Sequence, residues 1–135
     1  IQAAQRGIKV KVFLPAISDD PVHAALNRQN AERLVKAGGE VFFIDAGRDG
    51  KRFTHGKIMT IDGIWTTMGS TNTDSRALGI NQELNLSVTD ARFTETVEKR
   101  VFARDEHSSV PFTNTRFPLW TRLKAKIFSF FHSVL

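Results

Sequence analysis

The chain has 135 residues, 41% of them hydrophobic, which is enough to build the core of one domain of ordinary size. Its 19 Lys and Arg residues exceed its 14 Asp and Glu residues, and this positive balance favours a polyanionic partner or an anionic membrane surface. The absence of cysteine excludes disulfides, thiolate nucleophiles and Cys-ligated zinc, and no stretch approaches the roughly 20 apolar residues that span a bilayer.

The N-terminal third predicts a strand–helix–strand unit. Residues 1–7 are typical of a last helical turn stopped by glycine, so we expect a fragment whose upstream part is missing. Residues 8–14 alternate between apolar and polar positions and predict a strand. A helix is expected from Pro21 to the glycines after residue 37, followed by a strand at 40–44. This order predicts an α/β fold, with a mixed β-sheet flanked by helices.

The middle of the chain predicts a hairpin, a third strand and a covering helix. Residues 54–61 and 64–68 flank the pair Asp62-Gly63, which is a strong signal for a two-residue turn. Residues 83–88 alternate as a strand, and Asp90 is a candidate N-cap for a helix that continues to about residue 105.

Two segments interrupt this regular pattern. Residues 46–52 carry glycines and charges and predict a loop. Beyond Ser108 the sequence breaks at two prolines, and aromatic and basic residues then dominate. We therefore expect one domain at residues 1–107 and a basic, aromatic tail at 108–135, which either packs on the protein or lies as a helix on anionic lipid.

The residues that can carry chemistry gather around the predicted hairpin. At two-residue spacing on a strand, His55 and Lys57 project from the same face. An imidazole can attack phosphorus when neutral or protonate a leaving alkoxide when charged, while an ammonium neutralises phosphoryl oxygens. The pair is therefore a candidate catalytic site for a phosphodiester, and we expect it to need neither a metal ion nor another cofactor.

The nearby polar residues extend this candidate site. Ser70 and Asn72 offer neutral donors for phosphoryl oxygens, and Glu83 could hold a histidine in the required tautomer. Asp62 has two interpretations, a catalytic one with His55 and Lys57 and a structural one, since turn geometry alone explains Asp-Gly between two strands.

The spacing His-x-Lys-x4-Asp, followed by Gly-Ser-x-Asn, resembles the signature of the phospholipase D superfamily, and the likeness extends roughly from Gly7 to Trp120. Asp74 and Arg76 also fit and are expected to form an internal ion pair, whereas Ala77 and Gln82 depart from the usual pattern. The resemblance implies that two such motifs meet, one histidine forming a phosphohistidine and the other serving as general acid and then base. This chain carries one motif, so a second half in the same chain or a homodimer mate is implied.

Within that superfamily, the motif and the basic tail are similar to the C-terminal half of bacterial cardiolipin synthases. This implies a phosphatidyltransferase that converts phosphatidylglycerol to cardiolipin and glycerol at the bacterial cell membrane, on either its cytoplasmic or its periplasmic face. The implied partners are a phospholipid substrate and an anionic membrane surface, rather than nucleic acid. Three alternatives stay open: a phospholipase D hydrolase, a homodimeric single-motif nuclease, and a membrane-docking fragment without activity.

Overall fold

The computed structural model describes residues 1–16, 21–44, 54–72 and 82–112. These residues form two units: one joins the N-terminal residues to the segment that begins at Ser108, and the other comprises Thr54–His107. The predicted loop at 46–52, the ion pair of Asp74 and Arg76, the departure at Ala77 and the tail beyond residue 112 lie outside the described residues.

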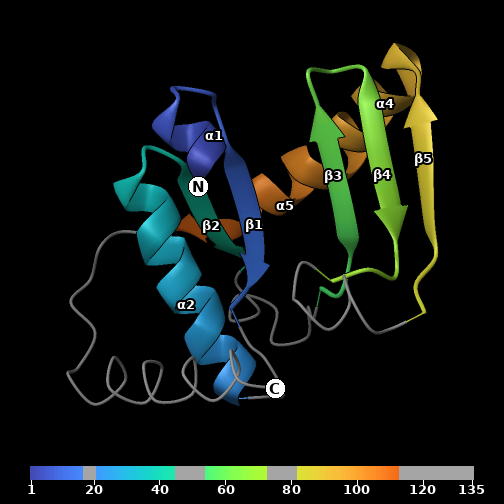
Figure 1. Cartoon of the computed structure of the whole chain (residues 1–135). Helices are drawn as coiled ribbons and strands as arrows, with labels where there is room; N and C mark the ends of the chain where they lie inside the picture. Colours follow the sequence, from blue (N-terminus) through green and yellow to red (C-terminus); the bar gives the residue numbers. More distant parts are fainter. Residues whose placement is uncertain (17–20, 45–53, 73–81, 113–135) are drawn as a thin grey trace. The chain divides into compact units, whose positions relative to one another are not determined.

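The first unit is a three-stranded mixed sheet with helices packed on it (Figure 1). Strands β1 and β2 are parallel, and β6 pairs antiparallel with β2, giving the order β1-β2-β6. The elements are α1 at Gln2–Gln5, β1 at Lys11–Pro15, α2 at Pro21–Lys36, β2 at Glu40–Ile44 and β6 at Ser109–Pro111.

The core of this unit lies between the helices and one face of the sheet. Val41 on β2 is buried with Ala31 and Leu34 of α2 and with Ala4 of α1. Since side chains alternate along a strand, Val12, which is opposite Val41 in the register, reaches the same core. The crossover helix thus covers the sheet that its flanking strands form, as the strand–helix–strand pattern predicted.

Most of the predicted elements of this unit are confirmed. The helix at 21–36 and the strand at 40–44 have the expected positions, and the parallel pairing agrees with a crossover connection. The first strand is shorter than the alternating run, because it begins at Lys11, and it extends through Pro15. Strand β6 was not predicted, since three residues ending in proline carry no readable periodicity.

The second unit is an antiparallel sheet in the order β3-β4-β5, followed by a continuous helical segment. Figure 1 shows β3 and β4 joined at one end as a hairpin, with β5 beside β4. The elements are β3 at Lys57–Ile61, β4 at Trp65–Gly69, β5 at Asn85–Thr89, α4 at Ala91–Val97, the π-helical turn η1 at Glu98–Phe102 and α5 at Ala103–His107.

Helix α4 is fixed to this sheet by its cap and by one buried polar pair. Asp90 accepts a hydrogen bond from the Phe93 amide at 2.7 Å, which confirms it as the N-cap. Thr94 on the helix and Thr66 on β4 are both fully buried, and their hydroxyl oxygens lie 2.9 Å apart. Because each hydroxyl is the other's partner, neither is left unsatisfied in the core.

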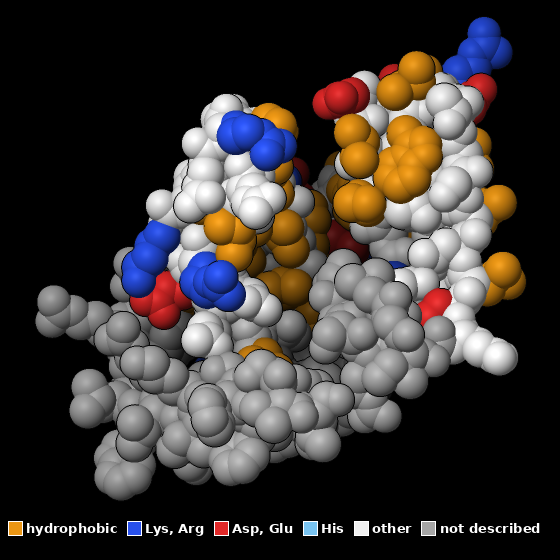
Figure 2. All heavy atoms as spheres, viewed as in Figure 1, with side chains coloured by type: hydrophobic (Ala, Val, Ile, Leu, Met, Phe, Trp, Pro, Cys, Tyr) orange, Lys and Arg blue, Asp and Glu red, His pale blue; other side chains and the backbone are white. Residues whose placement is uncertain are grey.

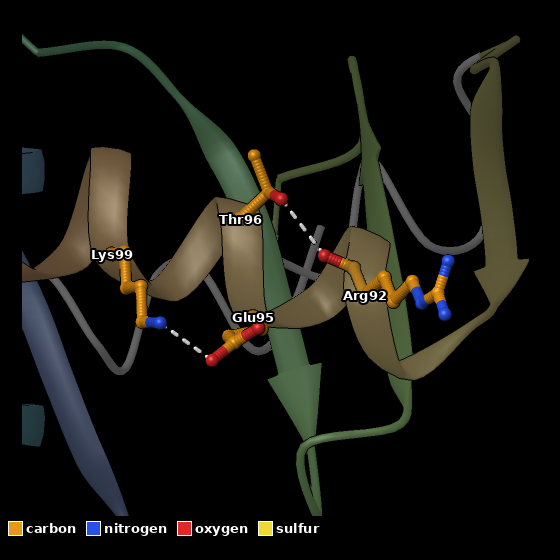
Figure 3. Close-up of polar contacts among 4 residues, drawn as sticks. All are labelled: Arg92, Glu95, Thr96 and Lys99. Carbon is orange, nitrogen blue, oxygen red and sulfur yellow. Dashed lines mark hydrogen bonds and ion pairs between the residues drawn. The ribbon is translucent and has the colours of Figure 1, made fainter.

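The solvent side of this helical segment carries ordinary local contacts (Figure 3). Lys99 pairs with Glu95 one turn earlier, and the Thr96 hydroxyl donates to the Arg92 carbonyl at 2.8 Å. Exposed pairs at this spacing contribute only a few tenths of a kcal/mol each. These four residues therefore form a solvent-exposed helix face.

The other face of the second sheet is partly apolar. Thr66 points to α4, and its partner on β3, Thr60, lies on the same face of the sheet. Met59 and Ile61 are the neighbours of Thr60 on β3, so they lie on the opposite face, where they are 49% and 46% exposed. Ile64 in the turn is 51% exposed, and Figure 2 shows hydrophobic side chains gathered over this hairpin. Within this unit, α4 packs on the Thr66 face of the sheet, and Met59 and Ile61 lie on the other face.

The α/β class with sheets flanked by helices is confirmed, although the strands divide between two units. The domain boundary expected at Ser108 stays a prediction for the tail. The first described residues beyond Ser108 belong to the first unit, because β6 pairs with β2 and the Phe112 amide donates to the Val41 carbonyl at 2.8 Å.

Candidate functional site

The closed end of the β3–β4 hairpin consists of residues 62–64, because Ile61 is opposite Trp65, and it is one residue longer than the predicted two-residue connection. Asp62 and Gly63 have φ angles of 53° and 66°, and the Ile64 amide donates to the Ile61 carbonyl at 3.1 Å. Positive φ at both central positions defines a type I′ turn, whose twist matches that of the flanking strands. Asp-Gly suits this turn because aspartate tolerates the left-handed region and glycine enters it without steric cost.

The open end of the same hairpin brings His55 and Lys57 together. The Lys57 ammonium nitrogen lies 2.6 Å from Nδ1 and 2.9 Å from Nε2 of the His55 ring. It also donates to the His55 carbonyl at 2.9 Å. The sequence argument placed both residues within a strand, but His55 precedes β3, whose first residue is Lys57. The two side chains nevertheless converge, because the Lys57 side chain turns back over the residue two positions earlier.

This contact limits the hydrogen bonds that the two side chains can form with each other. An ammonium group has only donors, so a ring nitrogen that accepts from it must offer a free lone pair. His55 is exposed and Lys57 is half-buried, so an anionic group in solvent can reach the pair.

The end of β4 lies beside this pair and leads into Ser70. In the hairpin register Lys57 is opposite Gly69. The Ser70 amide donates to the Leu84 carbonyl at 3.0 Å, and the Ser70 hydroxyl accepts from the Leu84 amide at 3.0 Å. The same hydroxyl donates to the Glu83 carboxylate. Ser70 is thus held to the segment that enters β5 by its backbone and its side chain.

These contacts refine the expected roles of the neighbouring residues. The Ser70 hydroxyl proton is directed at Glu83, so donating to a phosphoryl oxygen would require it to leave that partner. Asn72, two residues on, is exposed. The roles of Ser70 and Asn72 in phosphate binding and of Glu83 in orienting a histidine stay predictions.

Asp62 does not join this cluster. It lies beyond the far end of β3, and a strand of five residues spans roughly 17 Å. Of the two interpretations of Asp62, the described geometry therefore favours the structural one. Its place in the signature is explained by the turn that closes the hairpin and sets the register in which Lys57 meets Gly69.

One residue beside the site was missed by the sequence argument. Asn85, the first residue of β5, lies opposite Gly69, and its side-chain oxygen accepts from the Thr71 amide at 3.4 Å. A Cβ atom added to Gly69 would overlap the Asn85 side-chain oxygen and the Leu84 carbonyl, and would lie 2.7 Å from the Asn85 Cα. The glycine before Ser70 was a signal that another chain segment approaches closely there.

Two further observations concern metals and membranes. Among residues 1–16, 21–44, 54–72 and 82–112, no three His, Asp or Glu side chains are grouped so that they could hold a metal ion. No helix in the described part of the chain combines the length and the apolar character needed to cross a bilayer.

Comparisons with known proteins agree with the signature. Residues 1–105 match the family described as "Cardiolipin synthase, PLD-like domain". Cardiolipin synthase B of Escherichia coli strain K12 is 33% identical over 96 residues, which cover 71% of this chain and 22% of that protein. Cardiolipin synthase A of Citrobacter koseri is 29% identical over 136 residues, covering 98% of this chain and 27% of that protein. The chain thus spans about a quarter of the length of these relatives.

A solved structure supports the fold. The phospholipase D family member Nuc from Salmonella typhimurium superposes with a TM-score of 0.61 over 84% of this chain and 70% of its own, at 15% sequence identity. At this identity the likeness shows the fold alone. Taken with the family match over residues 1–105, it shows that the chain belongs to the phospholipase D superfamily and, within it, to the PLD-like domain family of the cardiolipin synthases.

Proposed function

We propose that this chain is the half of a phospholipase D-type phosphatidyltransferase that supplies the general acid and base. The reaction that fits best is cardiolipin synthesis, in which one phosphatidylglycerol gives its phosphatidyl group to another and glycerol is released. The contact between the Lys57 ammonium and the His55 ring carries this proposal, because it joins a proton-transfer group to a cation on an accessible strand end. The family match supports the choice of substrate.

In the proposed reaction the phosphodiester anion replaces the imidazole as the partner of Lys57. The ammonium then neutralises a non-bridging oxygen of the phosphodiester, and the His55 ring exchanges a proton with the alcohol oxygen. The nucleophilic histidine of the second motif attacks phosphorus, a phosphorus–nitrogen bond forms, and the bond to the glycerol oxygen breaks. His55, carrying a proton in this step, gives it to the departing alkoxide.

The second step reverses the first with a different alcohol. The hydroxyl of the second phosphatidylglycerol loses its proton to His55, its oxygen attacks phosphorus, and the phosphorus–nitrogen bond breaks. His55 takes up one proton in this step and gave up one in the first step, so it ends the cycle in the protonation state in which it began. The scheme thus begins and ends with the transferable proton on His55.

The remaining residues assist this exchange. We assign Ser70 and Asn72 to the phosphoryl oxygens once the substrate is bound, and Glu83 to the orientation of a histidine. In this role Ser70 would turn from Glu83 to the substrate. Asp62 contributes through the turn, and no cofactor or metal ion enters the scheme.

The proposal includes a second motif and a lipid surface. A second His-x-Lys motif would come from another half of the same chain or from a homodimer mate, related to this one by approximate two-fold symmetry. Residues 1–107 would form the catalytic domain, and the basic, aromatic tail would adjoin anionic lipid of a bacterial cell membrane.

The deciding experiment is product analysis with the intact protein. Vesicles of phosphatidylglycerol labelled in the unacylated glycerol are incubated with the protein, and products are identified by mass spectrometry. Formation of cardiolipin with release of labelled glycerol is expected. Phosphatidic acid without cardiolipin would establish hydrolysis instead of transfer, and cleavage of DNA without any lipid product would replace the proposal by the nuclease alternative.

A further inference from the structure

We infer that Asn85 is a positioning residue for the loop that carries Ser70, and this inference rests on the proposed function. Asn85 lies outside the His-x-Lys and Gly-Ser-x-Asn segments. Its side chain is nevertheless placed against the backbone on both sides of Ser70, at Gly69 and at Thr71.

The Asn85 side chain fills the space beside Gly69. Gly69 and Asn85 are opposite each other in the register of β4 and β5. The space that a side chain at position 69 would fill is occupied by the Asn85 side-chain oxygen and the Leu84 carbonyl. Glycine is therefore required at the end of β4 so that the Asn85 side chain can lie over the backbone there.

A second contact is a hydrogen bond just beyond Ser70. The Thr71 amide donates to the Asn85 side-chain oxygen at 3.4 Å. Without this acceptor, the amide would have no strand partner at this point, since β4 ends at Gly69. The Leu84 carbonyl accepts from the Ser70 amide one residue past the end of β4, and the Asn85 side chain extends the connection to Thr71.

The segment that enters β5 has three successive contacts with the Ser70 segment. Glu83, Leu84 and Asn85 are consecutive, and each contacts the segment that contains Ser70. Leu84 contributes backbone groups only, so its side chain can vary, and that side chain is 81% exposed. Glu83 and Asn85 contribute side chains two residues apart, one to the Ser70 hydroxyl and one to the Thr71 amide.

This arrangement gives Asn85 a role in the rate of the reaction. The Ser70 hydroxyl and the Asn72 amide act on the phosphoryl group only if the backbone between them keeps its direction. Asn85 accepts a hydrogen bond from the amide of Thr71, which lies between Ser70 and Asn72. Loss of the acceptor oxygen is therefore expected to lower kcat by about tenfold to a hundredfold, with KM changed much less.

The test compares three variants of the intact protein. Asn85→Leu keeps a side chain of similar size and loses the acceptor, whereas Asn85→Asp keeps an acceptor oxygen. Ser87→Ala is the matched control, because Ser87 lies two positions further on the same face of β5 and contacts only the Thr67 hydroxyl, at 3.5 Å, among the contacts resolved for it. Each variant is assayed for kcat, KM, thermal unfolding and hydrogen exchange of the Thr71 amide by NMR.

Asn85→Leu is expected to speed exchange of the Thr71 amide about fivefold and to lower kcat, while Asn85→Asp and Ser87→Ala stay close to wild type. A lower unfolding midpoint with unchanged kcat would overturn the inference, since it would show a structural role alone. Unchanged exchange of the Thr71 amide in Asn85→Leu would also overturn it. If the unsubstituted protein transfers no phosphatidyl group, the proposed function fails, and the exchange measurement still decides whether Asn85 holds this loop.

Discussion

The two ends of the β3–β4 hairpin differ in the physical requirement that explains their residues. One end is the turn at Asp62 and Gly63, and the other is the open end at His55 and Lys57. At the turn, two positive φ angles restrict the choice to residues that tolerate the left-handed region. At the open end, no unusual backbone angle is required of His55 or Lys57, and their side chains contact each other. On the proposed function, the signature therefore combines residues that suit a backbone geometry with residues that carry the chemistry.

The largest expected effect is at the open end. His55→Ala should reduce phosphatidyl transfer by more than about a thousandfold, because it removes the proton-transfer group, while thermal unfolding changes little. His107→Ala, which removes another exposed histidine of the same unit, is the control and should retain activity. Near-normal turnover by His55→Ala would end the catalytic assignment.

Lys57→Ala should be nearly as severe, with a loss of about a hundredfold to a thousandfold in kcat/KM, since the phosphoryl oxygens lose their cation. Lys99→Ala provides the comparison, because Lys99 pairs with Glu95 on the exposed helix and lies far along the chain from the motif. Equal rates for the two lysine variants would show that Lys57 is only a solvated strand residue.

Gly69→Ala tests the backbone contact at the open end. The added methyl group would meet the Leu84 carbonyl and the Asn85 side chain, so β4 and β5 must separate there. We expect a loss of about 2–3 kcal/mol in the free energy of unfolding, measured by urea denaturation, together with lower activity. A wild-type unfolding curve would mean that the two strands are not as close as described.

At the turn, Gly63→Ala should cost less, about 1 kcal/mol, because alanine at a φ of 66° is strained but meets no other atoms. Its catalytic rate in the folded fraction should stay within about twofold of wild type. A large loss of kcat with normal stability would contradict the view that this end is structural.

The smallest effect is expected for Asp62→Asn. Asparagine is favoured at the first central position of a type I′ turn, so stability should change by less than about 0.5 kcal/mol. Transfer activity should likewise be close to normal. A loss as large as that of His55→Ala would return Asp62 to the catalytic group and remove the distinction between the two ends of the hairpin.

The sequence predicted best those features that depend on local periodicity or on a single turn. The helix at 21–36, the strand at 40–44, the Asp62-Gly63 turn and the Asp90 cap all agree with the structure. Each of these features depends on residues that are neighbours in the chain, so a short stretch of sequence contains both the pattern and the interactions that produce it.

The features that were missed depend on contacts between distant segments. Strand β6 exists because β2 offers it an edge, and the place of Asn85 follows from the register of β5 on β4. The partner of the Ser70 hydroxyl is likewise a residue 13 positions away. No local pattern contains that information, although Gly69 signalled that some segment must come close.

The strand β6 has a consequence for how the protein is made. Its three residues leave the ribosome after all of Thr54–His107, but their partner β2 has been available since Ile44 emerged. During that interval one side of β2 is unpaired and open to a foreign strand. Of the two sheets that the structure describes, the one that contains β2 begins first in the chain and is completed last, because its third strand follows the whole of the other unit.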